Sequence, residues 1–135
     1  VFIGLNDLHL DMGLKFMFQP VASGLVEELV SKVLLAGKPC GFGGIARVGE
    51  GLIPGEMVLA EHVRVGSTGV ILSRTFHRKS SHLSDLHASM NMQEELHKLR
   101  NKEQHLTLSS LPELKVIQAD FQQRVAQIVN GNETK

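Results

Sequence analysis

The chain has 135 residues, of which 42% are hydrophobic and 21% charged, a composition typical of a soluble globular domain rather than a disordered segment. Its 14 basic and 14 acidic residues cancel, so no overall positive field favours a nucleic-acid partner. The single cysteine, Cys40, excludes an internal disulfide bond, and no run of apolar residues is long enough to predict a membrane partner. The expected setting is cytoplasmic, provided that no signal segment preceded Val1.

The first elements predicted along the chain are a strand and a helix. Residues 1–4 are apolar up to Gly4 and predict a strand, and Ser23 offers a side-chain oxygen that could cap a following helix. Apolar residues then recur at spacings of three and four, which places them on one helical face. These residues are Val26, Leu29, Val30, Val33 and Leu34.

Two further strands and a second helix follow. After a helix stop at Gly37, residues 38–45 predict a glycine-rich strand, and Pro54 begins a helix of residues 54–65 that ends at Gly66. Residues 69–73 are apolar without alternation, as in a parallel strand covered on both faces. Strands that alternate with helices predict the α/β class with parallel strands.

The composition changes after Phe76, which divides the chain into a part of residues 1–76 and a helical extension of residues 77–135. A polar connector precedes a predicted helix of residues 83–104, whose few apolar anchors are Leu83, Leu86 and Met90. A last helix begins at Ser110 and Glu113, which form a capping-box pattern. Its apolar stripe must be buried, and it consists of Leu114, Ile117, Phe121, Val125 and Ile128.

The candidate site lies directly after the first strand. Loops at the carboxyl ends of parallel strands commonly bind ligands, and Asn6 and Asp7 occupy such a position. Gly4 would let a ligand approach the backbone closely, and the Asp7 carboxylate could hold Mg or Mn, which prefer hard oxygen ligands. The alternative is that Asp7 only caps the turn through nearby backbone N–H groups.

Other motifs carry less weight. Residues 41–46 match a dinucleotide-binding glycine pattern, but the glycines and proline that follow prevent a helix from opening there. Arg47 could reach an anionic substrate, although a structural ion pair is the more frequent role of such a residue. His9 and Asp11 are expected in a loop beside Asp7. Glu56, Glu61 and His62 are expected on a solvated helix face.

Residues 2–8, with Gly13 after them, resemble the sixth-strand motif of the HpcH/HpaI aldolase and citrate lyase family. Residues 37–41 and 66–72 are similar to the lead-ins and strands seven and eight of that family. The resemblance covers about residues 1–76, and it rests on the order and spacing of three segments. Leu5 stands where the family usually has proline.

The resemblance implies the C-terminal half of a (β/α)8 TIM barrel, about strands six to eight, with a two-helix C-terminal extension. It implies that Asp7 is one of two carboxylate ligands of Mg or Mn. It also implies that the backbone N–H groups of Asn6 and Asp7 hold the carboxylate of a pyruvate-type 2-oxo acid, or of an acyl substrate. The metal would stabilise an enolate while a carbon–carbon bond is cleaved or formed.

The rest of the family's machinery lies on earlier strands. A whole barrel needs about 250 residues, so the sequence predicts a fragment of a lyase that is inactive by itself. The family commonly assembles through C-terminal helices, which implies a homo-oligomer whose interface includes residues 106–135. A different interpretation is a noncatalytic α/β interaction module that uses its C-terminal helices.

Overall fold

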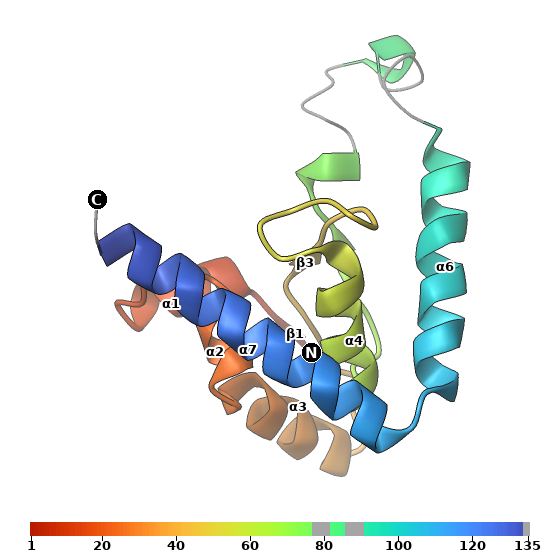
Figure 1. The fold of residues 1–135 in the computed structure, drawn as a ribbon. Helices are drawn as coiled ribbons and strands as arrows, with labels where there is room; N and C mark the ends of the chain where they lie inside the picture. The colour runs from red at the N-terminus through yellow and green to blue at the C-terminus, as the bar shows by residue number, and fades with distance from the viewer. Residues whose placement is uncertain (77–81, 86–90, 134–135) are drawn as a thin grey trace.

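The computed structural model describes residues 1–76, 82–85 and 91–133, and it has a mixed α/β fold that is mostly helical (Figure 1). The strands are short, the longest helices lie at the C-terminal end, and the described residues form no closed barrel. The elements in order are β1 (Phe2–Ile3), α1 (Leu5–Asp11), α2 (Gln19–Ala22), α3 (Leu25–Leu35), β2 (Gly41–Phe42), β3 (Gly44–Ile45), α4 (Gly55–Val65), β4 (Ile71–Leu72), a 3-10 turn (Arg74–Phe76), α6 (Met92–Leu108) and α7 (Leu111–Glu133).

The strands pair in two small parallel sheets, which confirms the predicted parallel direction. In the first sheet Phe2 is opposite Gly41, and in the second Gly44 is opposite Ile71. The sequence predicted one strand over residues 38–45, but Gly43 divides it, because its φ of 54° interrupts the extended backbone. The two halves of this segment therefore pair with different neighbours, β1 on one side and β4 on the other.

The helix α3 begins two residues later than its predicted cap. Ser23 is the last residue of the preceding turn, where its Oγ donates a hydrogen bond to the Pro20 carbonyl at 3.2 Å. Gly24, with a φ of 89°, occupies the N-cap position instead. The short helix α2 had not been predicted, and Ser23 ends this helix instead of capping α3. The apolar face was predicted correctly, since Val26 and Val30 are buried.

Helix α4 has the predicted position and forms the centre of the packing. It begins after Pro54 and ends at Gly66, which is left-handed with a φ of 80°. One face covers the strand segment, where His62 stacks on Phe42, and its other sides contact α3, α6 and α7. The fully buried side chains around it include Phe42, Ile45 and Phe121. The hydrophobic core therefore lies between the short strands and the helices.

The prediction that the third strand is covered on both faces is wrong. Ile71 is 59% exposed and Leu72 is 38% exposed, although α/β strands of this apolar character are normally enclosed. Val1 and Phe2, at the other end of the strand set, are exposed as well. The middle strands are buried, with Phe42 and Ile45 at 0% exposure, so the exposed apolar side chains lie on and beside the outer strands β1 and β4.

The helix predicted over residues 83–104 is found in part, since residues 83–85 are helical and α6 covers Met92–Leu108. Leu83 is 73% exposed, and the predicted anchors Leu86 and Met90 lie outside the described residues. Helix α6 begins after Asn91, whose side-chain oxygen accepts a hydrogen bond from the Glu94 backbone N–H at 3.1 Å. This asparagine cap was overlooked in favour of the apolar residues before it.

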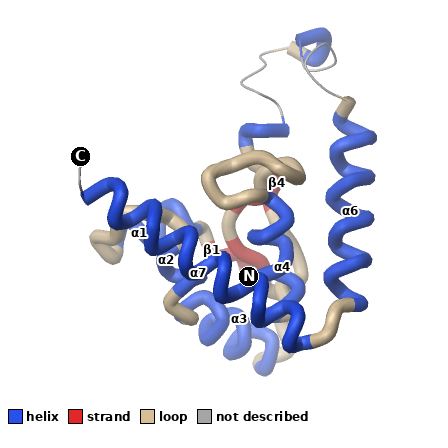
Figure 2. Tube along the Cα trace, viewed as in Figure 1, coloured by secondary structure: helices blue, strands red, loops and turns tan. Residues whose placement is uncertain are grey.

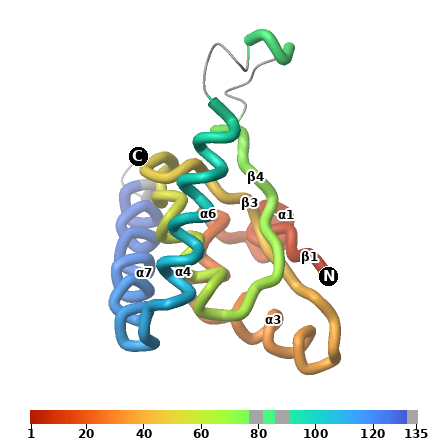
Figure 3. Tube along the Cα trace, turned by 90° about the vertical axis from the view of Figure 1, so that its right-hand side faces the viewer, coloured from red at the N-terminus to blue at the C-terminus, as the bar shows by residue number. Residues whose placement is uncertain are grey.

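Helix α7 begins at the predicted capping box. The Ser110 backbone N–H donates to the Glu113 carboxylate at 2.7 Å, and the Glu113 N–H donates to the Ser110 hydroxyl at 3.4 Å. Figure 3 shows α7 and α6 beside α4, and α7 also contacts α2. Three residues of its stripe, Leu114, Phe121 and Val125, are buried within this chain, and Ile117 and Ile128 are partly buried. Phe121 is fully covered, and its ring lies 5.9 Å from that of Phe18.

The burial of this stripe bears on the expected assembly. A homo-oligomer through the C-terminal helices stays a prediction, but within one copy the stripe already has its contacts. No helix in the described part of the chain is both long and apolar enough to cross a membrane.

Candidate functional site

The candidate site lies at the carboxyl edge of the short strands, which are near the middle of the molecule (Figure 2). Because β1 pairs in parallel with β2, and β3 with β4, each of the two small sheets has its own carboxyl edge. Gly4 follows β1, Arg47 lies two residues after β3, and Ser73 follows β4. The residues selected by the sequence analysis therefore lie at two places, with Gly4, Asn6 and Asp7 after β1 and Arg47 after β3.

Asn6 and Asp7 do follow the first strand, but they lie in the first turn of helix α1 rather than in a loop. Gly4 is the N-cap residue, in an extended conformation, and its carbonyl accepts the Leu8 backbone N–H at 3.0 Å. Gly4, Asn6 and Asp7 are all exposed. The first backbone N–H groups of a helix have no partner within it, so this turn presents donors to the strand edge.

The Asp7 carboxylate lies close to Gly4. A Cβ added to Gly4 would lie 3.3 Å from Asp7 Oδ2, closer than such contacts usually are. The absence of a side chain at Gly4 therefore leaves room for the carboxylate, which differs from the predicted close approach of a ligand to the backbone. The carboxylate also lies in the first turn of α1, where a negative charge is favoured by the helix dipole.

Leu5 fixes the start of α1 against the strands. Its side chain is 1% exposed, and a Cβ added to Gly43 would lie 2.6 Å from Leu5 Cδ1. The glycine at position 43 is thus required both by its positive φ and by the close approach of this leucine. This packing holds the helix turn that carries Asp7 at the end of β1.

The described residues supply only part of a metal site. The Asp7 carboxylate makes no hydrogen bond or ion pair with any other described residue, so its oxygens are available to a cation. No group of three or more His, Cys, Asp or Glu side chains that could hold a metal occurs among the described residues. Mg ions often take one or two protein carboxylates and complete their coordination with substrate and water. Asp7 is suited to be such a ligand, and a cation bound there would need further oxygen donors.

His9 does not join Asp7, and the expectation of a loop for His9 and Asp11 is wrong. Both belong to α1, and His9 turns inward, where its Nδ1 lies 3.2 Å from the Leu5 carbonyl. Residues two apart on a helix point to different faces, so His9 and Asp7 cannot share a cation. Asp11 lies a turn beyond Asp7 on the exposed face.

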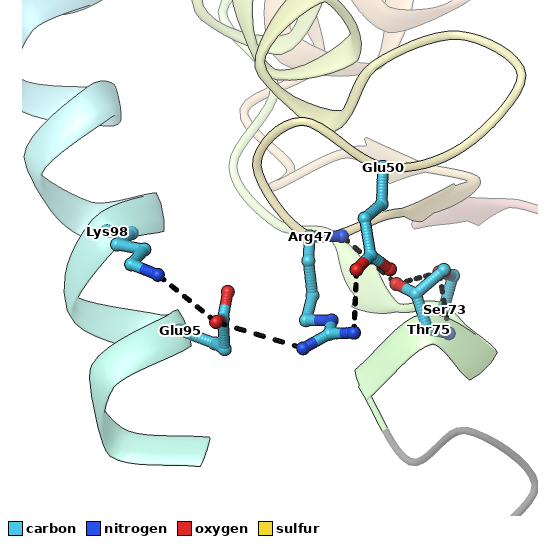
Figure 4. A network of polar contacts seen from close by, with 6 residues as sticks. All are labelled: Arg47, Glu50, Ser73, Thr75, Glu95 and Lys98. Atoms are coloured by element: carbon cyan, nitrogen blue, oxygen red, sulfur yellow. Dashed lines mark hydrogen bonds and ion pairs between the residues drawn. The ribbon is translucent and has the colours of Figure 1, made fainter. Parts of the chain in front are cut away.

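Arg47 forms the ion pairs that the sequence analysis preferred. Its side chain is 5% exposed, with Nη2 at 2.7 Å from Glu50 and Nη1 at 3.7 Å from Glu95 of α6 (Figure 4). Glu95 in turn lies 3.3 Å from Lys98. Arg47 therefore connects the loop after β3 to the C-terminal extension, and its charge is already balanced by carboxylates of this chain.

Hydroxyl groups connect the segment that follows β3 to the segment that follows β4. The Arg47 backbone N–H donates to Thr75 Oγ1 at 3.0 Å, and the Thr75 and Ser73 hydroxyl oxygens are 3.1 Å apart (Figure 4). These bonds fix the carboxyl edge next to the Arg47 ion pairs. The sequence analysis did not select Ser73 or Thr75.

Glu61 and His62 are buried, so the expected solvated face of α4 is wrong. Glu61 is 1% exposed and accepts a hydrogen bond from Arg64 Nε at 2.7 Å, while Arg64 Nη1 lies 2.9 Å from Glu27 on α3. Burial raises the pKa of Glu61, and Arg64 opposes that shift. Glu56 stays partly exposed and accepts the Gly49 N–H at 2.7 Å.

His62 packs against the strands. Its ring stacks on Phe42 with centroids 3.8 Å apart, and Nδ1 lies 2.7 Å from the Ser67 hydroxyl oxygen. Burial lowers the pKa of His62 to about 4, so the ring is neutral near pH 7. The spacing of Val58, His62 and Val65 on α4 was the signal for this inward position, because residues three and four apart share a helix face.

The dinucleotide-binding interpretation of residues 41–46 is excluded, as predicted. The segment forms the strand pieces β2 and β3, and the next helix begins only at Gly55. Comparison with known proteins gives no match to any family model, curated protein or solved structure.

Proposed function

We propose that this chain is part of a divalent-metal-dependent carbon–carbon lyase that acts on pyruvate-type 2-oxo acids. The observation that carries the proposal is the exposed Asp7 carboxylate, without a partner among the described residues, in the first helical turn after a parallel strand. That position agrees with the motif of residues 2–8, whose resemblance to the HpcH/HpaI aldolase and citrate lyase family covers about residues 1–76.

In this proposal the strands of the chain correspond to about strands six to eight of a (β/α)8 barrel. The parallel pairing of β1 with β2 and of β3 with β4 supports that order. Further support comes from the exposed apolar side chains on the outer strands, Phe2 and Ile71 among them. Additional strands of a barrel would cover such side chains, and water does not stabilise them.

The roles of the site residues follow from their positions. Asp7 would provide one oxygen ligand to Mg or Mn, and the backbone N–H groups of Asn6 and Asp7 would donate to the substrate carboxylate. The bound metal would polarise the keto oxygen as a Lewis acid. Gly4 would keep the space in which the Asp7 carboxylate lies. A base and a second carboxylate would have to come from outside the described residues, so the chain alone is expected to show no turnover.

Paramagnetic Mn2+ provides the test, because it broadens NMR signals near it even when binding is weak. With oxalate present as a pyruvate-like co-ligand, Mn2+ should selectively broaden the backbone signals of Gly4, Asn6 and Asp7. Asp7→Asn should abolish the broadening, since the amide no longer carries the negative charge that attracts the cation. Asp11→Asn is the matched control, because it removes an exposed carboxylate from the same helix.

The outcomes separate the two roles of Asp7. Broadening that persists in Asp7→Asn, or that is lost only in Asp11→Asn, would contradict the metal assignment. Asp7 would then be a carboxylate that stabilises the start of α1, the turn-cap role that the sequence analysis kept open.

A noncatalytic interaction module is the second candidate function. It is favoured by exposed apolar residues around the connection between α6 and α7, where Leu108 is 88% exposed and Val116 is 71% exposed. The proposed homo-oligomer would have to use such residues, since the stripe of α7 is covered within one copy. Selective Mn2+ binding at Asp7 would favour the lyase, because an interaction module has no need of it.

A further inference from the structure

A cavity of ≈ 380 Å³ lies between α4, α6 and the segment that leads into β4. Its volume is within the range of about 300–1,000 Å³ that small-molecule sites usually have. Its apolar walls come from Leu59 and Val63 of α4, Val70 and Leu72 of the β4 segment, and Leu96 and Leu99 of α6. The cavity is therefore formed only when the C-terminal extension is docked on the first part of the chain.

One wall of the cavity carries neutral hydrogen-bonding groups. Ser67 lies between two partners, with its Oγ 2.7 Å from His62 Nδ1 and 3.2 Å from the Gly69 carbonyl oxygen. A hydroxyl oxygen has two lone pairs and the imidazole can occupy only one of them. Ser67 thus keeps a lone pair for a donor on a bound molecule, while the histidine holds the hydroxyl in place.

The charges around the cavity cancel. Among the described residues that line it, Arg100 and Glu103 are the ionised ones, and their side chains pair with each other at 2.7 Å. Both are substantially exposed, at 77% and 41%, which places this pair at the mouth rather than in the interior. His62 contributes no charge near pH 7, because burial lowers its pKa to about 4. A charged ligand would lose its hydration without gaining an unpaired opposite charge.

We propose that this cavity binds a small neutral molecule with an apolar body and one hydroxyl or amide donor, which bonds to Ser67. The apolar body would lie between the aliphatic side chains of α4 and α6. This site is separate from the strand edge at Asp7, and it does not depend on lyase activity. It gives the C-terminal extension a role in ligand binding that the metal site does not require.

Binding at this cavity would be linked to the docking of α6. Because Leu96 and Leu99 form one wall, a ligand that fills the cavity binds the docked state and not an opened one. At about 100 times its Kd, such a ligand lowers the fraction of opened molecules about 100-fold. Amide hydrogen exchange in α6 should slow by that factor if exchange there requires undocking.

Benzyl alcohol is the probe for this site, with benzoate and benzylammonium as charged molecules of similar size. NMR titration of the 135-residue chain should give saturable shifts at Ser67, Val70, Leu96 and Leu99 with benzyl alcohol. Each charged analogue should bind at least about tenfold more weakly than benzyl alcohol, because its charge loses its hydration without gaining an opposite charge in the cavity. Hydrogen exchange in α6 is measured on the same samples.

Two variants test the two halves of the site. Ser67→Ala should weaken benzyl alcohol about fivefold, as expected for one lost hydrogen bond, whereas Ser109→Ala at the end of α6 should change nothing. Val70→Phe places a ring in the cavity and should abolish saturable binding. This variant tests the site without altering the contact between Ser67 and His62.

Three results would each overturn the proposal. The first is the absence of saturable shifts at the cavity walls with benzyl alcohol. The second is equal binding of benzoate, and the third is unchanged binding in a folded Val70→Phe variant. None of them bears on Mn2+ broadening at Asp7, so the metal proposal would stand or fall separately.

Discussion

Truncation of Phe121 tests how the C-terminal extension is held to the rest of the chain. Phe121→Ala should destabilise the fold by about 3–5 kcal/mol, the usual cost of removing a fully buried phenylalanine ring. Phe121 is 0% exposed and forms an edge-on contact with Phe18, with ring centroids 5.9 Å apart. That aromatic pair accounts for about 0.5–1.5 kcal/mol of the loss, and the remainder comes from burial and the cavity left behind.

The expected loss in the free energy of unfolding is large relative to the total stability of the domain. Domains of this size are stable by about 5–15 kcal/mol, so the variant should unfold at a clearly lower urea concentration. Val116→Ala is the matched control, because it truncates an apolar side chain of the same helix that is 71% exposed. The control should change the free energy of unfolding by less than about 0.5 kcal/mol.

Urea unfolding followed by circular dichroism, repeated over a wide range of protein concentrations, provides the measurement. If the α7 stripe is buried within one copy, the loss caused by Phe121→Ala is independent of concentration. If the stripe instead crosses between subunits, the stability of the unaltered chain rises with concentration. A loss below about 1 kcal/mol, or a clear dependence on concentration, would refute the intramolecular packing of α7.

Two further predictions concern buried positions in the first part of the chain. Because burial lowers the pKa of His62 from 6.5 to about 4, the unfolded chain binds the extra proton between these values, and stability falls by up to about 3 kcal/mol as the pH decreases through that window. The check is to measure the free energy of unfolding of wild type and His62→Leu at pH 7 and at pH 4.5, and an equal change in the two proteins would contradict the prediction. The raised pKa of Glu61 acts in the opposite direction, and it is common to both proteins. Gly41→Ala should destabilise the fold by about 1–3 kcal/mol, because the added Cβ would lie 2.1 Å from the Gly69 carbonyl oxygen. Gly69→Ala meets no atom within 4 Å, so thermal unfolding that affects both variants equally would argue against the close approach.

The sequence was sufficient where local chemistry decides the structure. The cap at Ser110, the stop at Gly66 and the apolar spacing on α3 depend on residues close together in the chain, and each was predicted correctly. The start of α3 was mispredicted because Ser23 has a competing local partner in the Pro20 carbonyl.

The misplaced features depend on contacts between distant residues. Gly43 could be read as part of a strand, since its positive φ and its contact with Leu5 arise only when α1 packs against the strands. Glu61 could be read as solvated because its partners, Arg64 and Glu27, come together only when α3 lies beside α4. Composition alone does not distinguish a buried ion pair from an exposed one.

For the candidate site, sequence reasoning gave the position of Asp7 after the strand but not its helical setting. A loop aspartate and a first-turn aspartate differ in what holds them, since the helix dipole favours the negative charge in the second case. That stabilisation would exist without any metal. The Mn2+ experiment with Asp7→Asn and Asp11→Asn distinguishes a metal ligand from a carboxylate that only stabilises the start of α1.

Helix α4 connects the two regions proposed here as sites. Its inner face packs on Phe42 through His62, and the same histidine holds Ser67 in the cavity wall. Its outer sides carry α6 and α7. Undocking of the extension would open the cavity and expose the α7 stripe, while the Leu5 contact that positions Asp7 would stay intact, because it lies between α1 and Gly43. The metal site should therefore survive changes in α6 and α7 that abolish binding at the cavity, and this separates the two proposals physically.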